Sequence, residues 1–458
     1  MSKYIRQSRE VKVFQMVAVL FLFSVYVLPQ YFGLPLPVFD LTILRIMIIG
    51  MTVLIIDQEN RKRDLVDLIQ HSGFTHFLIL YLITIFYTMV LRADLNAFLN
   101  PFIEIYTLYL VVYVVKYVLG WKKSIVWIIR FSYLLTVLGV LEYVIHRSPF
   151  SYLETIKGIY TGVFIRSGHY RIMGPCNHSL GYGLLLISLT PFSCYDLEQQ
   201  RVSMTKHLWL LLLFMVNIFL TGSRSTQAVF LLELGILYMF SPKEDKKKVI
   251  LIGISAASVF AAFLVVFHNT SIAKYIMLQM TTLLDTALGT SLSNQYGASN
   301  SALESSSNYR DQLIKIFQVD WLNPFLGIGR KRSFACQING SFIKSVDNFY
   351  IAEYIRYGYP GLFTYILFLG YFVTTIVKKI IKQHSSICKV LLAGILCYLV
   401  NLYWVDSLQT LKYLYLLFAI YYGAASDVTV PDTNENGVRT SIYIRERHGL
   451  AVCRRLVS

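Results

Sequence analysis

Charged residues are scarce in this chain of 458 residues. Lys, Arg, Asp and Glu together make up 15% of the sequence, whereas hydrophobic residues make up 55%. A soluble domain carries about 25% charged residues, so this composition excludes an ordinary water-soluble globular protein. Apolar runs close to the length of a bilayer crossing recur along the whole chain. The composition therefore predicts an all-α polytopic membrane protein.

Several motifs of familiar enzyme classes are also missing. The sequence has no phosphate-binding loop, no HExxH zinc motif, no GxSxG nucleophile turn and no CxxC pair. We therefore expect no metal ion and no cofactor. The formal net charge of +16 comes without a basic stripe interleaved with aromatic residues, so we expect no nucleic-acid partner. Basic cytoplasmic loops beside anionic membrane lipids explain that charge better.

Cysteine is rare as well. The six cysteines are Cys176, Cys194, Cys336, Cys388, Cys397 and Cys453. Only Cys176 and Cys336 would face the oxidising side of a membrane, so they form the one candidate disulfide. Lone cysteines are more often small buried residues, and we favour that interpretation.

Twelve apolar segments predict about twelve membrane-spanning helices. They lie near residues 13–32, 41–56, 74–91, 98–119, 124–145, 178–195, 207–222, 225–241, 249–267, 358–377, 387–403 and 407–424. Helices 1–9 thus fall within residues 1–267, and helices 10–12 within residues 358–424. Only Ser223 and Arg224 separate the seventh segment from the eighth, so these two form either a tight hairpin or one broken helix.

The distribution of Lys and Arg predicts the orientation. With the N-terminus in the cytoplasm, the inner loops hold most of the Lys and Arg found in short loops, as the positive-inside rule demands. Both termini are then cytoplasmic, and residues 425–458 form a polar cytoplasmic tail. The outer side carries a loop at 146–177 and a long loop at 268–357.

The long outer loop has two distinct parts. Residues 288–308 are rich in Ser, Asn and Gly, a composition typical of flexible segments. The segment Tyr309–Phe317 follows them. Its apolar residues have the spacing of a short amphipathic helix that lies against the bundle or the interface.

Three arginines lie on the outer side of the predicted topology: Arg171, Arg224 and Arg310. A guanidinium suits phosphate and pyrophosphate especially well. Arg224 has little loop to carry it to water, and a charge at membrane depth costs at least about 2.5–3.5 kcal/mol, so it is usually paired or functional. Taken alone, Arg171 would suit a snorkelling interface residue, and Arg310 a solvated helix face.

Asp347 directly precedes the tenth predicted helix. The common role of Asp at such a place is the helix N-cap, and the residue by itself favours that role. The functional alternative is a carboxylate that accepts the proton of an attacking hydroxyl. His169 and His178 titrate in a useful range, although outer-face histidines more often pack or cap.

Further charges near the tenth helix have structural interpretations. Glu353 is expected to form an ion pair with Arg356 or Lys344. The basic run at residues 330–332 is expected to face solvent or lipid headgroups.

The order of these motifs resembles the O-antigen polymerase and O-antigen ligase superfamily. The matching pieces are Arg171–Pro175, Ser223–Ser225, Tyr309–Asp311, Asn323–Gly329, Asp347–Ile351 and Gly358–Gly361. The resemblance covers about 165–365 in detail. It implies a GT-C-like helical fold and a metal-independent glycosyltransferase of the bacterial plasma membrane. Such an enzyme transfers glycan from an undecaprenyl-diphosphate carrier to a sugar hydroxyl on the outer side.

The resemblance also implies roles for individual residues. Arg224, Arg310 and Asp347 are the expected catalytic residues, because fixed guanidinium groups stabilise the leaving diphosphate and a base assists the acceptor hydroxyl. The base is Asp347 or His178, or no residue acts fully as one. The residues expected to bind diphosphate or glycan are Arg171, Arg166, Asn348, Tyr350 and His178.

Three functions remain in competition. Ligases of the superfamily typically have His before the Asn of this motif, where this chain has Asp347, and that difference favours the polymerase branch. A polymerase acts on an undecaprenyl-diphosphate-linked oligosaccharide, and a chain-length regulator is a candidate partner. A lipid-linked oligosaccharide flippase would show repeat symmetry and short loops, so the long asymmetric outer loop disfavours it.

Overall fold

A computed structural model of the chain describes residues 2–36, 40–160, 162–166, 169–296, 309–310, 312–332, 334–338, 341–343, 345–406, 411–425, 428–433, 439–447 and 450–453. Most of the segment expected to be flexible, from residue 297 to residue 308, lies outside the described residues. Asp311 and Lys344 also lie outside them.

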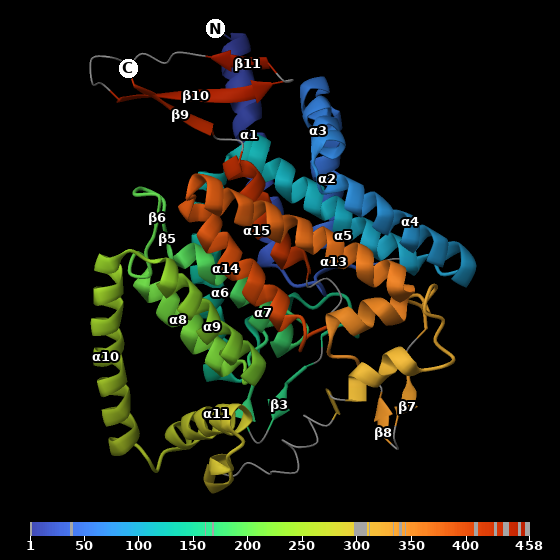
Figure 1. Cartoon of the computed structure of the whole chain (residues 1–458). Helices are drawn as coiled ribbons and strands as arrows, with labels where there is room; N and C mark the ends of the chain where they lie inside the picture. Colours follow the sequence, from blue (N-terminus) through green and yellow to red (C-terminus); the bar gives the residue numbers. More distant parts are fainter. Residues whose placement is uncertain are drawn as a thin grey trace.

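The described chain is mostly helical (Figure 1). Its first helices are α1 (Ser2–Tyr26), α2 (Ile43–Ile56), α3 (Glu59–His71), α4 (Thr75–Arg92), α5 (Asn96–Tyr113), α6 (Trp121–Ile145) and α7 (Ser179–Ser193). The later helices are α8 (Leu208–Leu220), α9 (Arg224–Phe240), α10 (Lys243–Val266), α11 (Ser271–Leu288), α13 (Phe349–Gln383), α14 (Ser386–Asn401) and α15 (Leu411–Ala425). A π-helical stretch, Val114–Leu119, extends α5.

Short antiparallel pairs of strands connect the helices. They are β1 (Gly33–Leu34) with β2 (Leu41–Thr42), β3 (Ile165–Arg166) with β4 (His169–Tyr170), β5 (Tyr195–Asp196) with β6 (Arg201–Val202), and β7 (Cys336–Ile338) with β8 (Ser341–Ile343). A three-stranded antiparallel sheet in the order β11-β10-β9 follows α15, from β9 (Val428–Thr433) through β10 (Arg439–Arg447) to β11 (Leu450–Cys453).

The helices agree with the apolar segments of the sequence. Each of the twelve predicted segments overlaps one of the helices. Five helices in the described chain are long and apolar enough to cross a membrane, and five further apolar helices are shorter. The polytopic membrane fold is therefore confirmed in its general form. The number of crossings and the GT-C-like architecture stay predictions.

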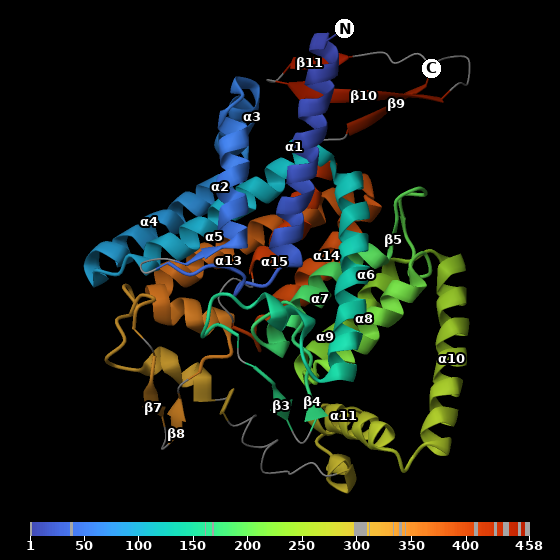
Figure 2. The same ribbon diagram turned by 180° about the vertical axis from the view of Figure 1, so that it is seen from behind.

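The centre of the bundle is formed by helices that are buried on nearly every side. Nearly all of α7 and most of α15 are buried. α15 packs on α5, α14 packs on α7 and α9, and α13 packs on α4. α10 is the opposite case, because its most apolar window is not buried in the chain at all, and it stands at the edge of the bundle in both views (Figure 2).

The two ends of the bundle carry different parts of the chain. Both termini and the three-stranded sheet lie at one end, whereas α11, β3 and β7–β8 lie at the other (Figures 1 and 2). We call the second the loop end. The predicted topology likewise puts both termini on one side and the long loop on the other, while the orientation in a membrane stays a prediction.

The seventh and eighth apolar segments form a helical hairpin and not one broken helix. α8 ends at Leu220, and α9 begins at Arg224. Gly222 lies between them with a φ of 59°, a left-handed conformation that glycine adopts without strain. The Ser223 side chain accepts the backbone N–H of Thr226 and caps α9. Arg224 is therefore the first residue of α9, at the loop end.

The tenth predicted helix begins nine residues earlier than expected. α13 begins at Phe349, and Gly358 interrupts it with φ 65° and ψ −166°. This interruption frees backbone groups that bind the turn-rich segment Asn323–Gly329, which we call the clasp. Ile328 N donates to Ile355 O at 2.8 Å, and Gly329 N donates to Arg356 O at 3.0 Å.

The remaining contacts of the clasp explain its composition. The Asn323 side chain accepts the backbone N–H groups of Phe325 and Leu326 at 2.9 and 3.1 Å, so it shapes the turn. A Cβ at Gly358 would collide with the carbonyl of Pro324. The glycines and the asparagine of the motif are thus needed for backbone contact.

The amphipathic segment after the undescribed part of the loop packs as expected. Leu313 and Ile316 are buried in a small apolar cluster that also contains Ile328, Tyr354 and Ile355. The described residues of this segment include a 3-10 helix, Ile314–Gln318, whose Ile316 is buried in this cluster.

Substituting Gly358 with Ala is expected to lower the free energy of unfolding by at least about 1–2 kcal/mol, because an L-residue is strained at this φ and its Cβ meets the clasp. Gly370→Ala is the matched control in the same helix. No atom lies within 4 Å of the position that a Cβ at Gly370 would take, so the melting midpoint of this variant should stay equal or rise slightly. Equal midpoints for both variants in detergent would contradict the role of Gly358.

Candidate functional site

Arg171 contacts the turn between α8 and α9, and Arg224 follows that turn in the chain. The Arg171 side chain is only 3% exposed, and its Nε donates to Thr221 O at 2.5 Å. Its guanidinium lies 5.0 Å from the centre of the Phe164 ring. Arg224 begins α9 just after the same turn. The snorkelling alternative for Arg171 is therefore wrong, because this side chain is buried against protein.

A buried carboxylate holds the loop that presents Arg171. Glu142, near the end of α6, accepts the backbone N–H groups of Met173 and Gly174 at 2.8 and 2.9 Å. It also accepts the Tyr170 hydroxyl at 3.0 Å. These three bonds fix the backbone around Arg171. The sequence signal for this role is a lone Glu in an apolar helix, and our expectations from the sequence did not include it.

The two histidines of this region pack and cap. His178 caps α7, since its Nδ1 accepts the Leu180 N–H at 3.1 Å. The His169 ring lies 4.2 Å from the ring of Tyr275 in α11, and burial lowers its pKa. Arg166 pairs with His169 across β3 and β4, while the side chain of Arg166 lies outside the described part of the structure.

Asp347 lies beside the start of the amphipathic segment. The Tyr309 hydroxyl donates to Ser345 O, and the Ser345 hydroxyl donates to Asp347 at 3.0 Å. Arg310 follows Tyr309 directly, so the structure brings the neighbourhoods of Arg310 and Asp347 together. The capping role expected for Asp347 is wrong, because the helix begins one residue later.

Asn348 is the cap of α13 instead. Its side-chain oxygen accepts the Ile351 N–H at 3.1 Å, and the residue is buried. Tyr350 is half-buried, and its hydroxyl donates to Leu399 O at 2.9 Å in α14. Both residues therefore hold the start of α13 in the bundle, next to the Asp347 carboxylate.

A buried charge network lies one turn further along α13. The Glu353 carboxylate is 2% exposed, and it lies 3.1 Å from the Arg356 guanidinium and 3.7 Å from that of Arg330. The Tyr81 hydroxyl donates to it at 3.0 Å. Arg356 also binds Asp406 at 2.5 Å. The expected pair of Glu353 with Arg356 is thus confirmed.

Arg330 corrects the expectation for the basic run. Its side chain is 7% exposed, and its Nε donates to the Tyr357 hydroxyl at 2.7 Å. Burial lowers the pKa of Arg330, but Tyr357, Glu104 and Glu353 raise it more, so the net pKa is well above its usual value and the group stays charged. Residues 331 and 332 are exposed, as predicted.

The backbone of the basic run is fixed by Asp94, in the turn between α4 and α5. One carboxylate oxygen accepts the N–H groups of Arg330 and Lys331 at 2.6 and 2.7 Å. The other accepts the N–H groups of Asn96 and Ala97. Asp94 thus fixes the backbone of this run, in which the Arg330 side chain is buried and residues 331 and 332 are exposed.

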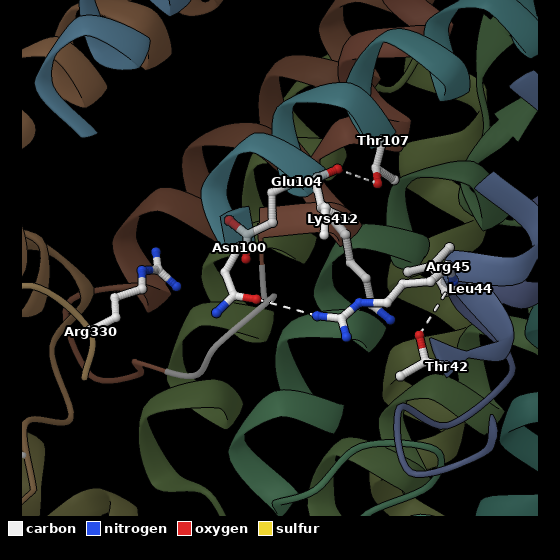
Figure 3. Close-up of a pocket in the computed structure, with 9 residues that line it drawn as sticks. Thr42, Leu44, Arg45, Asn100, Glu104, Thr107, Arg330 and Lys412 are labelled. Atoms are coloured by element: carbon white, nitrogen blue, oxygen red, sulfur yellow. Dashed lines mark hydrogen bonds between the residues drawn. The ribbon is translucent and has the colours of Figure 1, made fainter. Parts of the chain in front are cut away.

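Two cavities share Arg330 at the loop end. The first encloses about 570 Å³ of space, including its open mouth, and its polar lining includes Arg45, Asn100, Glu104 and Lys412 (Figure 3). The second encloses about 620 Å³, and Val346, the residue before Asp347, helps to line it. Neither cavity is lined by Arg171 or Arg224.

The second cavity is lined by charged residues from three separate segments: Arg330, Arg332, Arg356 and Asp406. Asp406 lies after α14, and burial raises the pKa of its carboxyl although the neighbouring Arg356 lowers it. This cavity is therefore lined both by residues of the buried network and by Val346, the neighbour of Asp347 in the chain.

Sequence reasoning missed the first cavity. Its residues come from the starts of α2 and α15, from α5 and from the basic run. One signal was available: Asn100, Glu104 and Thr107 recur at intervals of four and three residues, which puts them on one face of an apolar helix.

The described part of the chain also bears on the candidate disulfide and on possible metal ligands. Cys176 and Cys336 are both free thiols, so the candidate disulfide between them is wrong. The Cys176 thiol instead lies 3.2 Å from the Tyr413 hydroxyl. No group of three or more His, Cys, Asp or Glu side chains in the described residues is placed to hold a metal ion.

Residues 209–366 match the family model described as O-Antigen ligase. They include the turn with Arg224, the clasp, Asp347 and the buried network of Glu353. This match supports the resemblance of the chain to the O-antigen polymerase and ligase superfamily. Members of this family are glycosyltransferase-like enzymes of glycan biosynthesis, and the family implies a lipid-linked oligosaccharide substrate in the membrane. No curated protein matches the chain significantly.

Substituting Glu353 with Gln is expected to lower the free energy of unfolding by about 3–5 kcal/mol, because it leaves two buried guanidinium groups without their shared anion. Glu198→Gln is the control, since Glu198 pairs with Lys206 at the surface and such pairs contribute about 1 kcal/mol or less. Melting midpoints in detergent test the difference, and a similar small shift in both variants would contradict it.

Proposed function

We propose that this protein polymerises glycan repeat units in the bacterial plasma membrane. It transfers a glycan from undecaprenyl diphosphate to a sugar hydroxyl of another lipid-linked repeat unit on the outer side, with both termini in the cytoplasm. The product is an O-antigen, a capsule or an exopolysaccharide. A chain-length regulator is a proposed partner.

The observation that carries the proposal concerns Asp347: its residue type and the contacts of its carboxylate. The resemblance favours the polymerase branch because this chain has Asp where ligases have His. The geometry supports a chemical role, because Asn348 takes the capping function and leaves the Asp347 carboxylate with a hydroxyl contact from Ser345. Val346, the residue before Asp347, helps to line the second cavity.

The proposed reaction is a single displacement. The acceptor hydroxyl oxygen attacks the anomeric carbon, the bond from that carbon to the diphosphate oxygen breaks, and the diphosphate leaves with the electron pair. Asp347 takes the hydroxyl proton. Arg224 and Arg310 stabilise the developing charge together with Arg171, which Thr221 and Glu142 hold in place through the backbone.

The runner-up is an O-antigen ligase, which the description of the matched family favours. A ligase transfers finished glycan to the lipid A core. It uses the same donor and the same leaving group, so the arginines near Thr221 serve both functions equally. The acceptor alone distinguishes the two. The flippase is disfavoured by the family match.

Proteoliposomes with the full-length protein and lipid-linked repeat units extracted from a strain lacking it provide the test. The wild-type protein is expected to form a ladder of polymers without lipid A core. Transfer to lipid A core with no ladder would show a ligase. Movement of repeat units across the bilayer with no glycosidic bond would show a flippase.

In the same assay Arg224→Ala is expected to lower the rate of polymer formation by about 10²–10³-fold, because it removes a fixed cation from the leaving group. Asp347→Ala is expected to lower it by about 10²–10⁴-fold through loss of the proton acceptor. Arg147→Ala, at an exposed site of the outer loop, is the control and should retain activity. A normal ladder from Arg224→Ala at equal protein level would remove Arg224 from the site.

A further inference from the structure

The first cavity collects positive charge at the loop end. Arg45, Arg330 and Lys412 are its cations, and Glu104 is the one carboxylate that lines it. In Figure 3 the side chains of Arg45, Asn100, Glu104 and Lys412 come together around the same space, and Arg330 approaches from the opposite side. A positively charged, partly enclosed space of this kind favours an anionic ligand.

Lys412 is the decisive residue. It is 3% exposed at the start of α15, and Figure 3 shows its side chain extending toward Arg45. Its ammonium lies 5.1 Å from the centroid of the Tyr413 ring. The Glu104 carboxylate in the same cavity attracts it. Among the described residues, no carboxylate forms an ion pair with it. Burying a charge without a partner is costly, so such a group is retained where a ligand supplies the opposite charge.

The other polar groups of the cavity are already oriented. The Arg45 guanidinium donates to Asp40 O at 2.5 Å and to the Asn100 side chain at 3.3 Å. Tyr357 and Glu353 hold Arg330 in the same way. Side chains that are fixed before a ligand arrives bind it with a smaller loss of entropy.

The surroundings suit a ligand with a long hydrocarbon chain. On α2, one helical turn and more beyond Arg45, Ile49 and Val53 are exposed on the surface of the described bundle. Phe102 is exposed on α5, two residues from Asn100. In a membrane these apolar side chains contact lipid tails, so an anionic headgroup in the cavity has an apolar surface beside it.

We propose that this cavity binds the diphosphate of the lipid-linked acceptor. The proposal rests on the polymerase function, because a polymerase holds two lipid diphosphates at once. The donor loses its diphosphate at the reaction centre. The acceptor keeps its diphosphate. The sugars of its repeat unit lie between this diphosphate and the attacking hydroxyl. The acceptor therefore needs a second anion site, apart from Arg171 and Arg224, and those two arginines do not line this cavity.

Binding stoichiometry tests the site without reference to activity. Full-length protein in phosphatidylcholine nanodiscs is titrated with undecaprenyl diphosphate and examined by native mass spectrometry. The wild type is expected to bind two molecules, and Lys412→Met and Arg45→Gln one each. Lys157→Met is the control, because Lys157 is 78% exposed and should leave two bound. One molecule on the wild type, or two on both cavity variants, would overturn the proposal.

The stability of the ligand-free protein provides a second readout. Lys412→Met removes a buried charge that forms no ion pair with a described residue, so its melting midpoint is expected to equal or exceed that of the wild type. A purely structural role for Lys412 would lower the midpoint and leave two molecules bound. That result would reject the site.

Kinetics assign the site to the acceptor. With labelled polymer on undecaprenyl diphosphate as donor and the single lipid-linked repeat unit as acceptor, Lys412→Met is expected to raise the KM for the acceptor about tenfold and to leave the KM for the donor and kcat within about twofold. Equal changes in both KM values would overturn the assignment.

Two further outcomes separate the sources of the anion. If added phosphatidylglycerol binds the wild type in a Lys412-dependent way and undecaprenyl diphosphate binds only once, the cavity holds a phospholipid headgroup and the proposal is wrong. Two bound undecaprenyl diphosphates, one lost in Lys412→Met, with no polymer formed, would reject the polymerase and support the cavity as a lipid-diphosphate site.

Discussion

The buried carboxylate of Glu353 holds the loop end of this protein together. It lies between the guanidinium groups of Arg330 and Arg356, and Tyr81 donates a hydrogen bond to it from α4. A charge is tolerated in such a place only when its neighbours compensate it. The long loop, α13 and α4 must therefore meet at one point, and Asp406 adds the segment after α14 through Arg356. Both cavities depend on this meeting.

The motifs that the superfamily shares combine structural and chemical residues. Gly358 and the clasp provide backbone contacts, and Asn348 provides a helix cap. These residues stabilise the fold around the site and take no part in the proposed reaction. Asp347 does not cap the helix, and the residue before it, Val346, helps to line the second cavity. With the structural residues set aside, the residues proposed to take part in the reaction are Asp347 and the outer arginines.

The cations of the loop end fall into two groups with different surroundings. Arg171 and Arg224 lie at the turn between α8 and α9, where Glu142 holds the neighbouring backbone. Arg45 and Lys412 lie at the starts of α2 and α15 around a separate space. Two separate groups of cations in one bundle agree with the proposed transfer between two lipid-linked substrates, in which one diphosphate departs and the other stays attached.

The sequence by itself determined the helical membrane fold, because the hydrophobic runs have the length and composition that a bilayer demands. It also pointed to Arg224 and to the pair of Glu353 with Arg356, which are local in the chain. The tertiary structure alone decided that Arg330 is buried and that Lys412 approaches Arg45. Such contacts join residues that are tens to hundreds of positions apart, and no local spacing encodes them. Burial and pairing of a charge depend on which helices become neighbours, and only the packed bundle settles that.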